Sequence, residues 1–73
     1  MNKCYWFVCE YQGNGAWKPI SKHCDYFCAK KECNRLFDER GGKYSKLPSI
    51  AVIDDSYLAE IGMLELGLSM LCN

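Results

Sequence analysis

The sequence predicts a small α+β fold, a single domain over residues 1–73 in which an N-terminal β-hairpin packs with one or two helices and a short third strand. Three observations carry this prediction. A run of aromatic and β-branched residues ends at Gly13-Asn14-Gly15, which is typical of a hairpin. Residues 24–37 contain no glycine or proline and repeat apolar side chains at helical spacing. Ser49–Ile53 is a short apolar run.

The predicted hairpin covers residues 3–20, with residues 3–12 as the first strand and Ala16–Ile20 as the return strand. Gly13 and Gly15 can take positive φ at little cost, as the turn requires. Pro19 cannot donate to a strand ladder, so we expect the return strand at an edge of the sheet. Alternation makes both faces of the first strand apolar, with Tyr5, Phe7, Cys9 and Tyr11 on one and Cys4, Trp6, Val8 and Glu10 on the other.

A helix is predicted over residues 24–38, in a unit that begins at Ser21. Gly41-Gly42 is a common signal for the end of a helix. The apolar side of the predicted helix comprises Tyr26, Ala29, Cys33, Leu36 and Phe37. The opposite, solvent-facing side is basic and carries Lys30, Lys31 and Arg35. A fold of this size needs rings for its core. We expect Trp6, Phe7, Phe27 and Phe37 there.

The chain then continues as a basic loop over residues 39–48 and as a strand followed by an apolar helix over residues 49–72. Asp54-Asp55-Ser56 offers capping oxygens for that helix. Its apolar stripe, Tyr57, Ile61, Leu64, Leu68 and Leu71, repeats at helical spacing, and we expect Leu64 and Leu68 in the core. Gly62 and Gly67 each cost a helix interior about 1 kcal/mol relative to alanine, so the segment needs tertiary contacts.

The neutral net charge hides a strong asymmetry along the chain. Residues 1–46 hold nine bases and five acids, whereas residues 47–73 hold four acids and no base. Such a split points to a partner surface rather than to a catalyst. Acidic residues interrupt the one long apolar stretch, so no membrane span is expected. The first residues lack the features of a secretory signal, and we therefore expect a cytoplasmic protein.

The six cysteines, Cys4, Cys9, Cys24, Cys28, Cys33 and Cys72, leave three states open. No two of them are separated by the two residues typical of a zinc knuckle. A structural zinc site could still use Cys4, Cys9, Cys24 and Cys28, with His23 as a further ligand. Buried free thiols and disulfides are the alternatives. No cofactor is required by any motif, and a bound zinc remains one of the open states.

Catalytic motifs are missing from the sequence. His23 stands beside a cysteine, but no orienting carboxylate or oxyanion donor follows at a recognisable spacing. We expect His23 to be a surface or capping residue. There is also no phosphate-binding glycine loop and no nucleophile elbow. The sequence therefore predicts a binding protein, not an enzyme.

Two classes of partner fit the basic, aromatic front of the chain. A single-stranded nucleic acid could be held by its cations, with Trp17 and Tyr44 stacking on bases; the candidate cations are Lys18, Lys22, Lys30, Lys31, Arg35, Arg40, Lys43 and Lys46. A protein partner accounts for both halves of the chain, because a hairpin edge can accept a strand from another chain. The residues predicted to bind the partner are Trp17, Arg40, Lys43, Tyr44 and Lys46.

The Cys4-Tyr5-Trp6-Phe7-Val8-Cys9 strand and the Arg40-Gly41-Gly42-Lys43 loop, in a chain of this length, resemble the small transcription regulators of lytic Xanthomonas phages. We expect the chain to be a monomer. The resemblance implies a protein in the cytoplasm of a bacterial host. It would bind RNA polymerase near the amino-terminal end of the β′ subunit, block initiation, promote antitermination and lie close to nascent RNA. The alternatives are a zinc-stabilised module that binds single-stranded nucleic acid and a secreted disulfide-rich effector.

Overall fold

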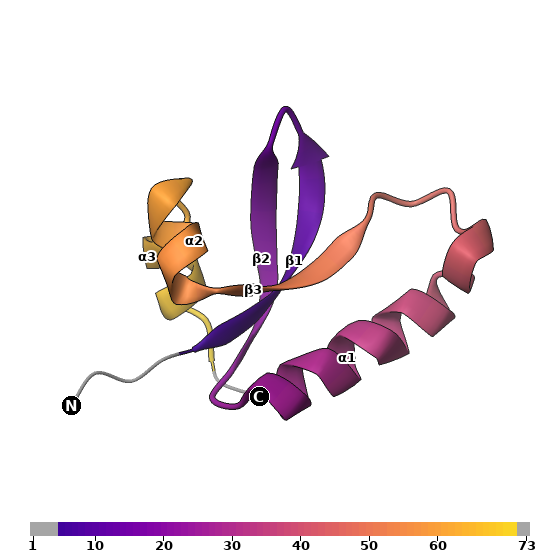
Figure 1. Cartoon of the computed structure of the whole chain (residues 1–73), viewed down its shortest axis with the longest axis horizontal. Coiled ribbons are helices and arrows are strands. Elements are labelled where there is room, and N and C mark those ends of the chain that lie inside the picture. The colour runs from indigo at the N-terminus through magenta and orange to yellow at the C-terminus, as the bar shows by residue number, and fades with distance from the viewer. Residues whose placement is uncertain (1–4, 72–73) are drawn as a thin grey trace.

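The computed structural model describes residues 5–71 and confirms the α+β fold. A hairpin of β1 (Trp6–Gly13) and β2 (Ala16–His23) leads into helix α1 (Tyr26–Glu39) and a 3₁₀ turn, η1 (Gly42–Tyr44). Strand β3 (Ile50–Asp54) follows, and the chain ends in the short helices α2 (Asp55–Glu60) and α3 (Leu64–Leu68) (Figure 1). The three strands form one antiparallel sheet in the order β2-β1-β3.

The hairpin turns where the sequence predicts it, through Gly13, Asn14 and Gly15, all at positive φ. Its return strand is longer than predicted, because it runs past Ile20 to His23. Ser21 is therefore part of the strand and does not begin the next unit. The register jumps from Val8 opposite Ser21 to Cys9 opposite Pro19, which places a bulge at Ile20. β2 is an edge strand, as Pro19 predicts.

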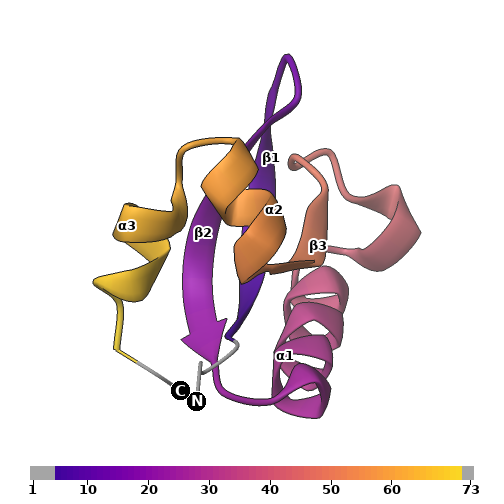
Figure 2. The same ribbon diagram turned by 60° about the vertical axis from the view of Figure 1, so that its left-hand side comes forward.

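The alternation along β1 builds an apolar cluster on each face of the sheet. Phe7 and Cys9 point to one face, where they pack with Ile53 and with Leu58 of α2. Val8 points to the other face, where Ala29 and Cys33 of α1 cover it. Helix α1 and the pair of α2 and α3 thus enclose the sheet from opposite sides (Figure 2). The prediction that both faces of the first strand are apolar is confirmed.

Helix α1 begins after Asp25 and ends where Gly41 takes a φ of 102°. Its inward positions are filled by the small side chains of Ala29 and Cys33, which let the helix approach the sheet closely. The expectation that Phe27 and Phe37 lie in the core is wrong, because 78% of Phe27 and 47% of Phe37 are exposed. Phe27 lies two positions before Ala29, a step that turns its side chain away from the sheet.

The carboxyl-terminal segment is two short helices rather than one continuous helix. Asp54 caps α2 as predicted, since its carboxylate accepts a hydrogen bond of 2.9 Å from the amide of Tyr57. The helix then stops at Gly62, whose φ is +75°. The amide of Gly62 donates to the carbonyl of Ala59, and that of Met63 donates to the carbonyl of Leu58, the pattern of a Schellman motif.

This break redirects the predicted apolar stripe. Leu58 is fully buried and Leu64 packs at the edge of the same cluster, but Leu68 is 43% exposed and Leu71 is 89% exposed. The expectation that Leu68 belongs to the core is therefore wrong, because periodicity is lost when the chain bends at Gly62. In residues 5–71 no helix has the length and apolar character that crossing a membrane requires.

Candidate functional site: a basic loop and an open strand edge

The loop after α1 is fastened to the sheet by Arg40. The Arg40 guanidinium donates from Nη2 to Oε2 of Glu10 at 2.7 Å and from Nη1 to the carbonyl of Pro48 at 3.0 Å. These bonds join the two ends of the loop to β1, and they leave only 17% of the Arg40 side chain exposed. The hydrogen bond from Arg40, helped by one from Gln12, lowers the pKa of the Glu10 carboxyl. Arg40 therefore positions the loop and is not displayed on it.

The tip of the loop displays a ring and two cations. The 3₁₀ turn is closed by the amide of Tyr44, which donates to the carbonyl of Gly41 at 3.1 Å. It leaves the Tyr44 side chain 81% exposed, with the Lys43 amine 5.3 Å from the centre of its ring. Lys46 is exposed a little further along. A cavity of about 250 Å³ lies behind the tip, lined in part by Phe37 and Ile50.

Trp17 lies apart from the loop, on β2. Its ring is half-buried, packs at the edge of the Phe7 cluster and contacts Tyr11 with a centroid distance of 5.0 Å. Of the five predicted partner-binding residues, Lys43, Tyr44 and Lys46 share the loop, Arg40 lies beneath it and Trp17 borders a separate groove.

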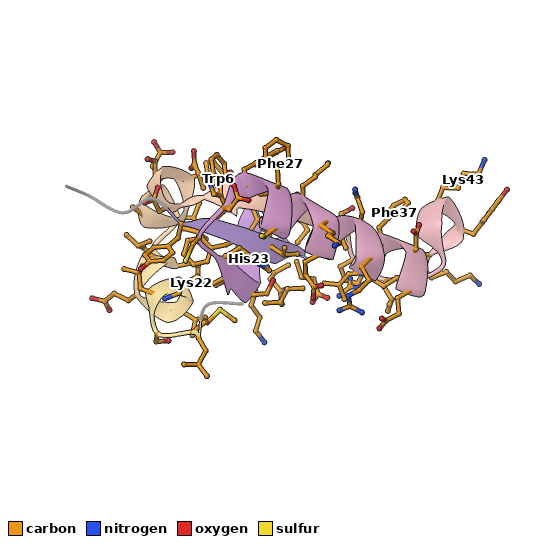
Figure 3. All side chains as sticks on the ribbon, turned by 90° about the horizontal axis from the view of Figure 1, so that it is seen from below. Trp6, Lys22, His23, Phe27, Phe37 and Lys43 are labelled. Atoms are coloured by element: carbon orange, nitrogen blue, oxygen red, sulfur yellow. The ribbon has the colours of Figure 1, made fainter. Side chains whose placement is uncertain are left out.

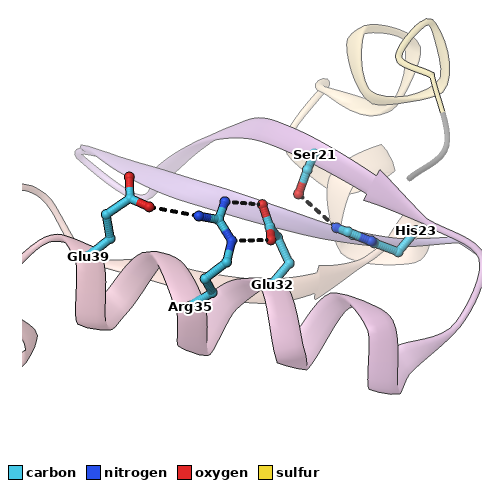
Figure 4. A network of polar contacts seen from close by, with 5 residues as sticks. All are labelled: Ser21, His23, Glu32, Arg35 and Glu39. Atoms are coloured by element: carbon cyan, nitrogen blue, oxygen red, sulfur yellow. Dashed lines mark hydrogen bonds and ion pairs between the residues drawn. The ribbon is translucent and has the colours of Figure 1, made fainter.

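Three of the eight predicted nucleic-acid-binding cations donate hydrogen bonds inside the protein. The buried Lys22 amine donates to the carbonyl of Leu68 at 3.1 Å and lies 4.5 Å from the centre of the Tyr5 ring. Arg35 is held between Glu32 and Glu39 on the surface of α1 (Figure 4), which raises the pKa of Arg35 and lowers that of Glu32. Arg40 is the third. The remaining five are exposed: Lys18, Lys30, Lys31, Lys43 and Lys46.

His23 is a buried residue, contrary to expectation. It is 3% exposed, and its Nε2 lies 2.8 Å from the hydroxyl of Ser21, which is itself 7% exposed (Figure 4). The position follows from the longer β2, which carries both residues into the sheet. Neither residue lines the loop cavity or the groove beside β3. The pair satisfies two buried polar groups and leaves little of either residue exposed.

The structure separates the cysteines of the predicted zinc site. Cys9 is fully buried beside Phe7, on the face that α2 covers, and burial raises its pKa to about 12. Cys28 is exposed on α1, which lies on the opposite face, and Cys24 is exposed just before that helix. Cys4 lies outside the described residues. Within residues 5–71 no three side chains of histidine, cysteine, aspartate or glutamate converge as a metal site.

The outer edge of β3 is a feature that the sequence analysis missed. The backbone amide of Tyr11 donates to the carbonyl of Ser49 at 2.8 Å, and hydrogen-bonded and non-bonded pairs alternate along this register. The amides and carbonyls of Ile50 and Val52 therefore point away from β1. No backbone bond within the described chain reaches these groups. A groove of about 410 Å³ runs beside them, lined by Trp6, Trp17, Ala51, Val52, Ile53, Asp54 and Tyr57. Strand order is not visible in a sequence, but the uncharged run Ile50–Ile53 was a usable signal.

The opposite edge of the sheet is protected. β2 carries Pro19 and the bulge at Ile20, both of which disturb strand pairing. Helix α3 also packs against β2, and Lys22 ties the two together through the carbonyl of Leu68. The edge open to a partner is therefore that of β3.

Comparison with known proteins identifies no relative: no family model, no curated protein and no solved structure matches the chain.

Proposed function

We propose that this chain is a small regulatory protein that binds the RNA polymerase of a bacterial host and alters transcription through that contact. The expected contact lies near the amino-terminal end of β′, close to emerging RNA, and the expected effects are a block of initiation and antitermination. The resemblance of the aromatic strand and the basic loop to phage transcription regulators supplies the identity of the partner. The exposed tip of the loop supplies the contact.

The observation that carries the proposal is the exposure of Tyr44 on a loop of fixed shape. The turn leaves 81% of Tyr44 exposed, so this ring contributes little buried surface to the free protein. Aromatic side chains are favoured anchors in protein interfaces, and an exposed ring on an ordered turn is therefore suited to contact with a partner. Lys43 and Lys46 place positive charge around the ring, where it can steer the loop towards an acidic surface. Arg40 holds the loop to β1 and Pro48, so little order has to be gained on binding.

Binding of single-stranded nucleic acid is the rival use of the same surface. The exposed lysines and Tyr44 have the chemistry for it, since cations neutralise phosphates and rings stack on bases. The two functions differ in their dependence on salt, because phosphate contacts release counterions and weaken steeply as salt rises.

The test measures binding of purified core RNA polymerase to the immobilised protein by biolayer interferometry. The wild type is compared with a variant that combines Lys43→Ala, Tyr44→Ala and Lys46→Ala, and with a control that combines Lys18→Ala and Lys30→Ala. The control also removes two positive charges, but from exposed positions outside the loop. We expect the triple variant to bind polymerase at least about tenfold more weakly, as loss of an interface anchor implies, and the control to bind as the wild type does.

A fluorescent single-stranded oligonucleotide is titrated in parallel at several salt concentrations. If the oligonucleotide binds tightly with a steep salt dependence and polymerase does not bind, the protein is a nucleic-acid-binding module instead. If the triple variant and the control lose polymerase binding equally, net charge and not the loop makes the contact.

A further inference from the structure

We propose that two copies of this chain pair through the open edges of β3, so that their sheets join into one continuous sheet of six strands. This inference goes beyond the proposed function and does not depend on it. It departs from the expected monomer. The sequence does not reveal the order of the strands, so that expectation does not take the open edge of β3 into account.

The backbone of β3 is suited to pairing with a second copy of itself. The amide and carbonyl of Val52 point outward, so a two-fold axis beside Val52 lets each Val52 donate to the other. The same register places Ile50 of one copy opposite Asp54 of the other. The first four residues of β3, Ile50–Ile53, carry none of the charges or prolines that normally block edge-to-edge pairing.

Two exposed rings on α1 lie at opposite ends of β3. Phe27 contacts Tyr26 at 6.0 Å between ring centroids, Tyr26 contacts Trp6 at 5.0 Å, and Trp6 is paired with Asp54. Phe27 therefore marks the Asp54 end. Phe37 lines the same cavity as Ile50 and marks the other end. Figure 3 shows Trp6 and Phe27 on one side of the molecule, with Phe37 further along the same helix and Lys22 on the far side.

A two-fold axis at Val52 reverses one copy relative to the other. It therefore brings the Phe27 end of one copy next to the Phe37 end of the second. Burying two such rings from each copy would account for their exposure in the single chain, where Phe27 is 78% and Phe37 is 47% exposed. Large exposed rings near an unpaired strand edge are typical of a surface that is buried in a protein interface.

The charges around β3 favour a second copy over an unrelated strand. The residues just before β3 form the basic loop with Lys43 and Lys46, and Asp54 and Asp55 stand at its other end. Antiparallel pairing places the basic end of each copy beside the acidic end of the other. The chain is neutral overall, with nine bases and nine acids, so two copies meet without net repulsion.

The mass of the protein in solution is measured by sedimentation equilibrium for the wild type and three variants. Val52→Pro removes the outward amide while keeping an apolar side chain, and an edge strand tolerates proline where its amide faces outward. Phe37→Ser removes an exposed ring of the proposed interface. Leu66→Ser is the matched control, because Leu66 is also 47% exposed but lies on α3, beside the protected edge.

We expect the wild type to approach twice the 8.4 kDa mass of the chain as its concentration rises. Val52→Pro and Phe37→Ser should each raise the dissociation constant at least about tenfold, as loss of an interface anchor does. Leu66→Ser should leave it unchanged. An equal mixture of isotope-labelled and unlabelled wild type should give intermolecular nuclear Overhauser effects between Val52 and Val52 of the second copy, and between the Phe27 and Phe37 rings.

The proposal is overturned if the wild type stays monomeric up to about millimolar concentration, where even weak specific pairs associate. It is also overturned if Leu66→Ser weakens the dimer while Val52→Pro and Phe37→Ser do not. Intermolecular effects that connect residues other than those around β3 and α1 would mean that a different surface joins the two copies. A monomer that accepts only a foreign extended peptide at β3 would assign the edge to another partner.

Discussion

The backbone of Gly67 in α3 rests against the ring of Phe7 in β1. A Cβ atom built on Gly67 would lie 2.7 Å from Cε1 of Phe7, closer than real Cβ contacts allow, and 3.1 Å from Cδ1. Phe7 is fully buried in its apolar cluster, so its ring would have to displace neighbouring side chains to move. Glycine at position 67 is therefore what lets the short helix α3 close over the apolar cluster around Phe7.

Replacing Gly67 with alanine tests this contact. The change should raise intrinsic helix propensity by about 1 kcal/mol, but overpacking against a buried ring costs about 1–3 kcal/mol. We expect the clash to prevail and the free energy of unfolding to fall, as measured by urea denaturation. Adding Phe7→Leu to Gly67→Ala should recover part of the loss caused by the alanine, because the smaller side chain makes room. A Gly67→Ala variant as stable as the wild type would contradict the packing described here.

Gly62 is required for its backbone conformation alone. Its φ of +75° is strained for most residues, and a Cβ there would meet no atom within 4 Å. Gly62→Ala should therefore lower the free energy of unfolding by about 1–2 kcal/mol, measured by the same denaturation. Gly62→Asn is the control, because asparagine tolerates this conformation better, and it should cost clearly less. Equal losses for the two variants would mean that the bend does not depend on the left-handed conformation.

The bond between Glu10 and Arg40 should make the loop sensitive to acid. Arg40 lowers the folded-state pKa of Glu10 below its ordinary value of 4.5, so the bond stabilises the folded state at neutral pH and is lost as the pH falls through that lowered value. Chemical shifts of residues 42–46 should change in that acidic range. Glu10→Gln should abolish the change, and Glu39→Gln should not, since Glu39 pairs with Arg35. A loop that titrates identically in both variants would mean that Glu10 does not hold it.

Thiol reactivity should divide the cysteines by burial. Burial raises the pKa of Cys9 to about 12, so at pH 8 almost none of it is the thiolate, which is the reactive form. Cys33 is also buried, with a raised pKa, whereas Cys28 is exposed. Iodoacetamide labelling followed by peptide mass spectrometry should modify Cys28 rapidly and should modify Cys9 and Cys33 only on unfolding. Rapid labelling of Cys9 in the folded protein would contradict its position beside Phe7.

The sequence predicts those elements of this fold that local chemistry determines. The hairpin turn at Gly13-Asn14-Gly15, the apolar faces of β1, the end of α1 before Gly41 and the cap at Asp54 are all found where local preferences place them. Each of these features depends on a few neighbouring residues, so their preferences can be read from the chain.

The errors occur where distant packing decides. Periodicity predicts one carboxyl-terminal helix, but Gly62 bends the chain so that Leu58 and Leu64 can reach the Phe7 cluster. Likewise, the need for rings in a small core predicts that Phe27 is buried, but Ala29 and Cys33 occupy the face of α1 that meets the sheet. The position of β3 at an open edge depends on the order of the strands, which local preferences do not determine.

The central claim, that the tip of the basic loop contacts RNA polymerase, is tested most directly by hydrogen–deuterium exchange of the protein alone and bound to purified core polymerase. The amides of Tyr44 and Ser45 are held by single turn bonds to Gly41 and Gly42 and should exchange readily in the free protein. We predict that binding slows exchange over residues 42–46 more than anywhere in α3. Slowed exchange confined to α3, or no change at the loop in a saturated complex, would contradict the claim.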